Sequence, residues 1–233
     1  DDVVNAWPGG IGAYRDRLPV TDATPVITLF EGNTPLIPAP HISDLVGREV
    51  FLKFEGANPT GSFKDRGMTL AVSKAKEIGS KTIICASTGN TSSSLASYAA
   101  AAGLKCFVFL PNGKITVSKL SQSIAYGAIN IQSDGDFDTA MKAVEEICNE
   151  YGIYLLNSIN PYRIEGQKTI IFEILQQLNW QVPGWIVLPG GNLGNTAAVG
   201  KGLFELKELG IIDTLPKIAV IQANGANPFY QSF

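Results

Sequence analysis

The sequence predicts an α/β fold in which helices cover both faces of a mostly parallel sheet. From about residue 50 onward, short apolar strand-like runs alternate with helical patterns. Several helical runs stop at a glycine (Gly79, Gly103, Gly127 and Gly210), the residue expected just past a helix carboxyl end. Repeated βα alternation favours parallel strands buried on both faces. At 233 residues, the chain can bury the core of one large domain or two small ones.

The elements can be assigned in order along the chain. The expected strands are short apolar runs at residues 50–54, 82–86, 106–110, 128–132, 154–156, 184–188 and 218–222. The expected helices lie between them at residues 64–78, 91–102, 117–126, 137–150, 164–178 and 196–209. The segment before residue 45 is richer in Pro and Gly, so we expect it to wrap around the outside, apart from a short strand near 26–30. Residues 227–233 follow the last strand with no helical pattern, so we expect an incomplete domain there.

Charge and hydropathy favour a small-molecule partner. The net charge is −3, and the 18 Lys and Arg residues are scattered among 21 Asp and Glu with no basic run, so no nucleic-acid partner is expected. The longest apolar region, residues 95–110, is interrupted by Gly103 and Lys105, so no membrane span is expected. We expect no signal peptide either.

The three cysteines are Cys85, Cys106 and Cys148, an odd number with wide spacing. Neither a disulfide framework nor a zinc cluster is indicated, and Cys85 and Cys106, which lie in apolar runs, are expected to pack as small hydrophobic side chains. A cytoplasmic location follows, because free thiols persist in a reducing compartment.

The first motif that carries chemistry runs from Asn58 to Gly67, with the letters NPTGSFKDRG. Ser62 followed by Asp65 resembles a capping box, which places Lys64 in the first turn of a helix. The positive field at a helix amino end lowers an amine pKa, and a neutral lysine is what attack on a carbonyl requires. An ordinary solvated lysine is the simpler interpretation of this stretch alone.

Two further motifs follow strands and open helices. The turn STGNTSSS begins at Ser87, and its hydroxyls and N–H groups suit an anion. A capping cluster without a ligand is the alternative. The second motif is the loop PGGNLGNT from Pro189 to Thr196, whose glycines let N–H groups approach a phosphate. Its spacing fits neither the dinucleotide nor the nucleotide-triphosphate signature, so NAD and ATP are disfavoured.

Histidine chemistry is disfavoured as well. His41 is the single histidine and lies in a Pro-rich stretch, where we expect a surface or packing role. A Ser-His-Asp or Cys-His hydrolase and a histidine metal site are therefore not expected, and we predict no metal. A cofactor is the remaining source of a reactive group.

Taken together, these motifs resemble the fold-type II pyridoxal-phosphate (PLP) enzymes of the tryptophan synthase beta-like superfamily, and among them the threonine synthase family. The matching stretches are Gly32–Leu36, Lys53–Met68, Ala86–Thr91, Asn157–Lys168 and the glycine loop. The Asn157–Lys168 segment favours threonine synthase over its relatives.

The resemblance implies two parallel-sheet, three-layer αβα domains with the cofactor between them and the carboxyl-terminal part missing. Residues 57–157 would form the smaller domain; residues 1–56 and 158–233 would form the larger, incomplete, PLP-cradling domain. A Ser or Thr beyond residue 233 would contact the pyridine nitrogen.

The resemblance also implies the site residues. Lys64 would be the catalytic lysine that links covalently to PLP, and Asn90 would bond the 3′ oxygen of the cofactor. The PLP phosphate would be cradled by Gly191, Asn192, Leu193, Gly194 and Asn195. The substrate would contact the turn Ser87, Thr88 and Thr91 through its carboxylate, and Thr91, Ser158, Arg163 and Asn192 through its phosphate.

The implied activity is conversion of O-phospho-L-homoserine and water to L-threonine and phosphate, by a homodimer. Two alternatives remain. A serine/threonine dehydratase would share the lysine and the glycine loop but needs no site for a substrate phosphate. An inactive PLP-fold module is the second alternative.

Overall fold

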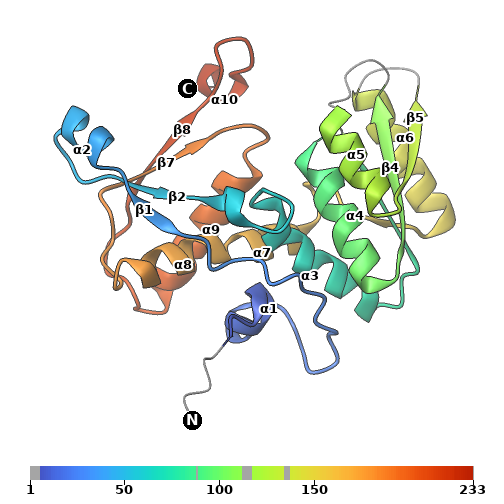
Figure 1. The fold of residues 1–233 in the computed structure, drawn as a ribbon, viewed down its shortest axis with the longest axis horizontal. Coiled ribbons are helices and arrows are strands. Elements are labelled where there is room, and N and C mark those ends of the chain that lie inside the picture. The colour runs from blue at the N-terminus through green and yellow to red at the C-terminus, as the bar shows by residue number, and fades with distance from the viewer. Residues whose placement is uncertain (1–5, 88, 112–116, 134–136, 233) are drawn as a thin grey trace. The chain divides into compact units, whose positions relative to one another are not determined.

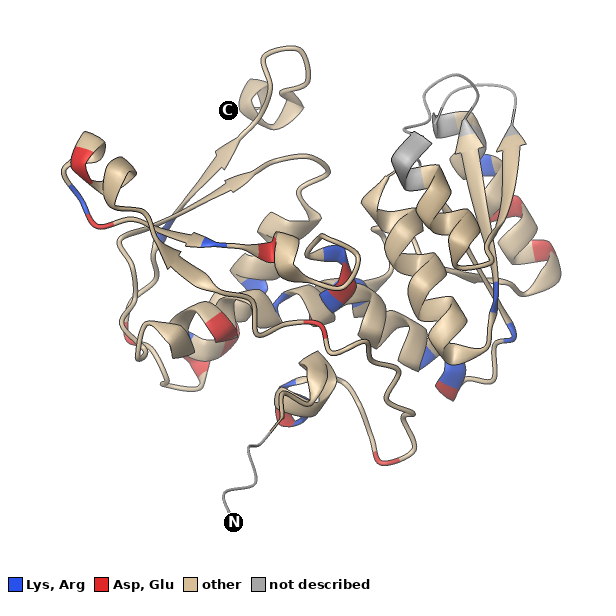
Figure 2. Ribbon diagram, in the orientation of Figure 1, with Lys and Arg blue, Asp and Glu red and all other residues tan. Residues whose placement is uncertain are grey.

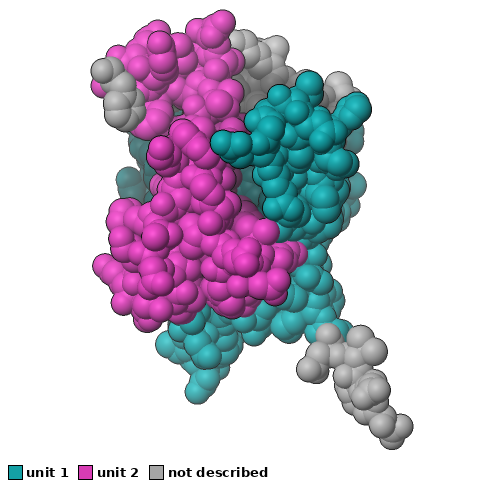
Figure 3. All heavy atoms as spheres, turned by 90° about the vertical axis from the view of Figure 1, so that its left-hand side faces the viewer, with its two compact units in different colours: residues 1–166 teal, residues 167–233 magenta. Residues whose placement is uncertain are grey.

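The computed structural model describes residues 6–87, 89–111, 117–133 and 137–232. The chain divides into two compact units, Asp1–Gly166 and Gln167–Phe233 (Figures 1 and 3). Each unit contains both helices and strands. The domain limits that the resemblance implies remain a prediction.

Unit 1 contains a four-stranded parallel sheet with the order β5-β4-β3-β6, on the right in Figure 1. Its strands are β3 (Thr82–Ala86), β4 (Lys105–Pro111), β5 (Ile129–Ser133) and β6 (Tyr154–Leu155). Its helices are α3 (Lys64–Glu77), α4 (Asn90–Ala102), α5 (Val117–Ala125) and α6 (Phe137–Tyr151). These bounds lie within one residue of the predicted elements.

The core of unit 1 lies on both faces of this sheet. On one face, Ile83 and Cys85 of β3 belong to an apolar cluster with residues of α3 and α4. On the other face, Ile84 and Ala86 pack with Val144 of α6. The alternation along β3 places successive side chains on opposite faces, and both faces are covered. The predicted parallel α/β architecture with helices on both faces is confirmed.

The amino-terminal part of unit 1 departs from the prediction. It contains α1 (Gly9–Ala13), η1 (Arg15–Arg17), α2 (Pro40–Val46) and η2 (Glu55–Ala57), together with the antiparallel pair β1 (Leu36–Pro38) and β2 (Phe51–Lys53). The run at 50–54 is therefore a strand, but it pairs with β1 and lies outside the parallel sheet.

The short strand expected at residues 26–30 is wrong. The backbone of this segment bonds to side chains: Ile27 N–H donates to Ser73 Oγ (3.0 Å), and Thr69 Oγ1 donates to the Ile27 carbonyl (2.7 Å). Phe30 also has a left-handed φ of 62°. Because hydroxyls of α3 take up these backbone groups, the segment runs along a helix and has no strand partner there.

Unit 2 contains α8 (Thr169–Gln177), β7 (Trp185–Pro189), α9 (Gly194–Glu208), β8 (Lys217–Ile221) and α10 (Pro228–Gln231), with β7 and β8 parallel. Helix α8 packs on α9, where Gly202 lies against Ile171. The single helix predicted at 164–178 is wrong, because α7 (Pro161–Gln167) and α8 are separated at Lys168. Helix α10 also occupies a place where no helix was expected.

Basic and acidic residues are interspersed over both units (Figure 2). Within the described ranges, no helix combines the length and the apolar character needed to cross a membrane.

Candidate functional site

Lys64 is the first residue of α3, in the first turn as the sequence predicts, and it is half-buried. Its Nζ lies 4.8 Å from the centroid of the Phe63 ring. Burial, and secondarily the positive charge of Arg163, lowers the pKa of the Lys64 amine from 10.5 to about 8. The pKa of Lys64 is lowered, as predicted. The leading cause is desolvation, however, whereas the sequence suggested the positive field at the helix amino end. About a tenth of the amine is therefore neutral at pH 7, far more than for an ordinary lysine.

The capping box predicted at Ser62 is wrong, because the Asp65 carboxylate has other partners. It accepts hydrogen bonds from Thr60 N–H (2.7 Å), Thr60 Oγ1 (2.6 Å) and Ser94 Oγ (2.6 Å). Helix α3 has no side-chain bond at its cap residue. Asp65 therefore ties the first turn of α3 both to the preceding loop and to α4, and this link differs from the predicted capping box.

Arg66 anchors the same turn from another direction. Its guanidinium is buried and binds Glu55 through Nε to Oε2 (2.7 Å) and Nη2 to Oε1 (2.8 Å). The Nη2 group also donates to Thr34 Oγ1 (3.1 Å). Gly166 of α7 lies so close to the Arg66 carbonyl that a Cβ there would collide with the backbone. The first turn of α3 is thus held by buried contacts on several sides.

The turn at Ser87 begins at the carboxyl end of β3, and a side chain completes the ladder there. The Asn157 amide accepts from Ala86 N–H (2.9 Å) and donates to the Ala86 carbonyl (3.0 Å). Within the turn, Gly89 N–H donates to Ser87 Oγ (3.2 Å), and Ser92 Oγ donates to the Gly89 carbonyl (2.7 Å). Asn157 thus takes the place of a neighbouring strand where β6 has ended.

The predicted ligands of this turn are distributed as follows. Asn90 and Thr91 are the first two residues of α4, and Ser158 follows Asn157 directly. Thr88 lies outside the described residues. Ser93 is fully buried, and its Oγ has no hydrogen-bond partner among the described residues. A buried hydroxyl without a partner is unusual, and it indicates a place for a polar ligand atom.

Arg163 lies in the first turn of α7, where the amino end is capped by Asn160 Oδ1, which accepts from Tyr162 N–H (3.1 Å). Its side chain is 1% exposed, yet Nε, Nη1 and Nη2 have no hydrogen-bond partner in the described part of the chain. Burial lowers the pKa of the guanidinium to about 10, which still leaves it protonated at neutral pH. A buried, unpaired cation is costly, so this guanidinium is a ready site for an anion.

The glycine loop lies in unit 2, between β7 and α9. Gly190 N–H donates to the Ile221 carbonyl (2.7 Å), and Gly194 N–H donates to Asn192 Oδ1 (3.1 Å). Leu193 has a left-handed φ of 62° as the cap residue of α9. The loop is therefore fixed to β8 at one end and turns sharply into the helix at the other.

The middle of the loop presents donors. Within the described residues, no bond within the chain occupies the N–H groups of Gly191, Asn192 and Leu193. Asn195 Oδ1 and Thr196 Oγ1 are buried without a partner in the same described part of the chain. Free N–H groups at the amino end of a 15-residue helix form a favourable anion site.

The structure brings several predicted residues of unit 1 together. Arg163 is close enough to Lys64 to lower its pKa, and the bond between Ala86 and Asn157 places Ser87 beside the 157–163 segment. The loop residues 191–195 belong to unit 2.

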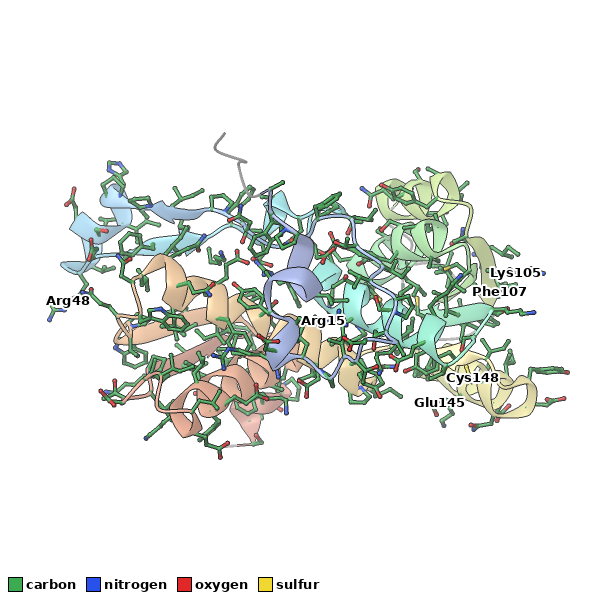
Figure 4. All side chains as sticks on the ribbon, turned by 90° about the horizontal axis from the view of Figure 1, so that it is seen from below. Arg15, Arg48, Lys105, Phe107, Glu145 and Cys148 are labelled. Atoms are coloured by element: carbon green, nitrogen blue, oxygen red, sulfur yellow. The ribbon has the colours of Figure 1, made fainter. Side chains whose placement is uncertain are left out.

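Cys85 and Cys106 are buried and His41 is on the surface, in agreement with the prediction, while Cys148 is half-buried. Cys85 and Cys106 are buried in the sheet, and burial raises the pKa of Cys106 to about 12. On α6, burial and the nearby Glu145 raise the pKa of Cys148 to about 11 (Figure 4). His41 is exposed on α2.

Residues 27–233 match the family described as pyridoxal-phosphate dependent enzyme. Among curated proteins, the chain is 54% identical to the threonine synthase of Synechocystis sp., over 97% of this chain and 59% of that protein. It is 52% identical to the threonine synthase of Methanocaldococcus jannaschii, over 96% of this chain and 56% of that protein. The chain thus spans less than two thirds of the length of these relatives.

Solved structures agree on the fold. Maize serine racemase matches with a TM-score of 0.78 at 25% identity, over 96% of this chain and 64% of that chain. Threonine deaminase isoform 2 from Solanum lycopersicum, in its processed form, matches with a TM-score of 0.72 at 26% identity, over 83% of this chain and 52% of that chain.

Proposed function

The chain belongs to the pyridoxal-phosphate dependent enzymes, and from this premise we propose that it carries the lysine-bearing part of a threonine synthase. The proposed reaction converts O-phospho-L-homoserine and water to L-threonine and phosphate by elimination and replacement, the last step of threonine biosynthesis. The relatives in Synechocystis sp. and M. jannaschii support this assignment.

The single observation that carries the substrate assignment is the buried guanidinium of Arg163. Its three nitrogens lack partners within the described residues while the side chain is 1% exposed. A phosphate group would satisfy it bidentately, whereas a dehydratase substrate carries no phosphate to place there. Thr91, Ser158 and Asn192 are the proposed companions of Arg163 in binding that phosphate, and Ser87, Thr88 and Thr91 those that bind the substrate carboxylate.

The described residues fit the cofactor. Within the described residues, the loop of unit 2 offers free N–H groups and the unpartnered Thr196 hydroxyl as donors to the PLP phosphate, which Gly191, Asn192, Leu193, Gly194 and Asn195 would hold. Lys64 would link to PLP, and Asn90 would bond the 3′ oxygen. When bound, PLP would act as the electron sink for the carbanion formed at Cα.

Lys64 is also the proposed proton carrier. Its amine, with a pKa of about 8, would accept the Cα proton of the substrate when it is not linked to the cofactor. The same amine is suited to move the Cβ proton before phosphate leaves Cγ and water adds at Cβ. The single histidine, His41, lies exposed on α2 and is a poor candidate for sharing these transfers.

The direct test is to reconstitute the chain with PLP and supply O-phospho-L-homoserine. Phosphate and L-threonine released in equal amounts would support the proposal. Ammonia released from L-threonine or L-serine without turnover of the phosphorylated substrate would favour a dehydratase. A protein that stays colourless with PLP would favour an inactive module.

The Arg163→Ala variant tests the phosphate site. We expect KM for O-phospho-L-homoserine to rise at least tenfold, about 1.4 kcal/mol, because the variant lacks the buried guanidinium. The matched control is Arg48→Ala, which removes an exposed arginine that is distant from Arg163 along the chain (Figure 4). Unchanged KM in Arg163→Ala would contradict the assignment.

We also propose a cytoplasmic homodimer. The raised pKa values of the thiols keep all three cysteines protonated, which suits a reducing compartment. Light scattering of the purified protein would give the oligomeric state.

A further inference from the structure

The Asp65 carboxylate lies where three segments meet: the first turn of α3, the loop at Thr60 and helix α4. It is fully buried, and three donors bind it at 2.6–2.7 Å. Burial raises the pKa of Asp65, and the bonds from Ser94 and Thr60 oppose that rise. Such short bonds to a buried carboxylate are strong and directional, so they define the position of the backbone that carries it.

We propose that Asp65 is a positioning residue for Lys64, holding the first turn of α3 so that the amine stays in its sheltered place beside Arg163. This inference rests on the proposed function only in taking Lys64 as the cofactor's anchor. One peptide bond joins the two residues, so a displacement of Asp65 moves Lys64 with it. Arg66, the next residue, is fixed by Glu55, so the two residues that follow Lys64 are both anchored.

The proposal can be tested by the direction in which the Lys64 pKa moves, because loss of positioning and loss of the Asp65 charge would act on that pKa in different directions. Glu31 is buried nearby and raises the pKa of Asp65; it accepts a bond from Tyr98 Oη (2.7 Å). Burial and the charge of Arg163 lower the pKa of Lys64. If the Asp65 charge alone acted on Lys64, removing it would lower the amine pKa further or leave it unchanged. Loss of positioning would expose the amine and raise its pKa.

The first experiment measures the pKa of Lys64 in the 233-residue chain without cofactor, from the extent of acetylation at a series of pH values, read by peptide mass spectrometry. For Asp65→Asn we expect the Lys64 pKa to rise by about one unit toward its ordinary value. The amide cannot accept from Thr60 N–H and both hydroxyls as the carboxylate does. An unchanged or lowered pKa, with only a lower unfolding temperature, would show a purely structural role and overturn the proposal.

Ser94→Ala keeps the proposal falsifiable if Asp65→Asn fails to fold. It removes one of the three bonds without changing any charge, and we expect a smaller rise of the Lys64 pKa. Ser97→Ala is the matched control: Ser97 is a buried serine of the same helix, but its Oγ donates to the Ser94 carbonyl. A rise in Ser97→Ala as large as that in Ser94→Ala would overturn the proposal.

A second readout uses the chain loaded with PLP. The pH at which the visible absorbance of the lysine-bound cofactor changes should shift in Asp65→Asn and not in Ser97→Ala; a shift of equal size in both would count against positioning. If the wild-type chain takes up no PLP, the proposed function fails, whereas the acetylation experiment still decides whether Asp65 positions Lys64.

Discussion

Helices α3 and α9 each begin at a residue proposed to bind the cofactor, but different parts of the chain hold the two helix starts in place: side chains at α3 and backbone at α9. At α3 in unit 1, buried side chains anchor the turn: Asp65 binds Thr60 and Ser94, and Arg66 binds Glu55. At α9 in unit 2, the turn is built from backbone, with a left-handed Leu193 and, within the described residues, N–H groups free of internal bonds.

The difference follows from the role proposed for each helix start, a reactive amine at α3 and an anion-binding loop at α9. A reactive amine has to be held by its neighbours while its own nitrogen stays unbonded, so the neighbouring residues carry the anchors. An anion cradle needs open N–H groups, and side chains around it would block the approach. Separate substitutions can therefore disrupt the two helix starts: removal of a charged side chain at α3, and addition of a Cβ to a glycine at α9.

The largest effect is expected from Lys64→Ala, which removes the group that distinguishes the start of α3. We expect complete loss of covalent PLP attachment, because the variant lacks the sheltered amine proposed to hold the cofactor. Visible absorbance and mass spectrometry after borohydride reduction would measure it. Lys76→Ala, on the exposed side of the same helix, is the control. Attachment that persists in Lys64→Ala would show that another lysine holds the cofactor.

Next in size is Glu55→Ala, which removes an anchor at the start of α3. It leaves the Arg66 guanidinium buried without its carboxylate, and breaking such a pair costs about 3–5 kcal/mol of unfolding free energy. Chemical denaturation would measure the loss. Asp22→Ala, which breaks the exposed pair with Arg15, should cost less than about 1 kcal/mol. Equal losses in the two variants would contradict the view that burial makes the anchor strong.

Much of this fold could be predicted from the sequence because βα alternation and helix-ending glycines are local signals. Residue 64 is the first residue of α3 as predicted, and Gly79, Gly103, Gly127 and Gly210 all have left-handed φ values. The strand predicted at 26–30 failed because its backbone partners, Thr69 and Ser73, lie more than 40 residues away in α3.

The residues that hold the site in place could not be predicted from the sequence for the same reason. Ser94 is 29 residues from Asp65, and Asn157 is 71 residues from Ala86, so no local spacing indicates either contact. Ser62 and Asp65 have the spacing of a capping box, yet the carboxylate turns to Thr60 and Ser94. Local patterns therefore located the turns, whereas long-range bonds decide how they are held.

A smaller effect is expected at the start of α9, where Gly190→Ala and Gly191→Ala form a matched pair. A Cβ on Gly190 would collide with Val220 and approach Gln222 Cγ to 3.1 Å, and overpacking of this kind costs about 1–3 kcal/mol. A Cβ on Gly191 meets nothing within 4 Å, so the fold should keep its stability. Denaturation curves would separate the two. A destabilised Gly191→Ala would show that the loop is more tightly packed than its backbone construction implies.

The smallest effect concerns the charge on Lys64 itself. The pKa is about 8 in the folded chain against 10.5 for an ordinary lysine, so between these values the unfolded state binds more protons. The cost of the sheltered cation is fully present below pH 8 and disappears as the pH rises toward 10.5, so the wild type gains stability with pH. Relative to Lys64→Met, which has no charge to titrate, we expect a gain of about 1 kcal/mol in unfolding free energy between about pH 7 and pH 9. Denaturation of both proteins at the two pH values measures this difference directly, because other groups titrate alike in both. A wild-type stability that falls relative to Lys64→Met over this interval would mean that the amine is stabilised as a cation, and the start of α3 would then be an unsuitable place for a nucleophilic lysine.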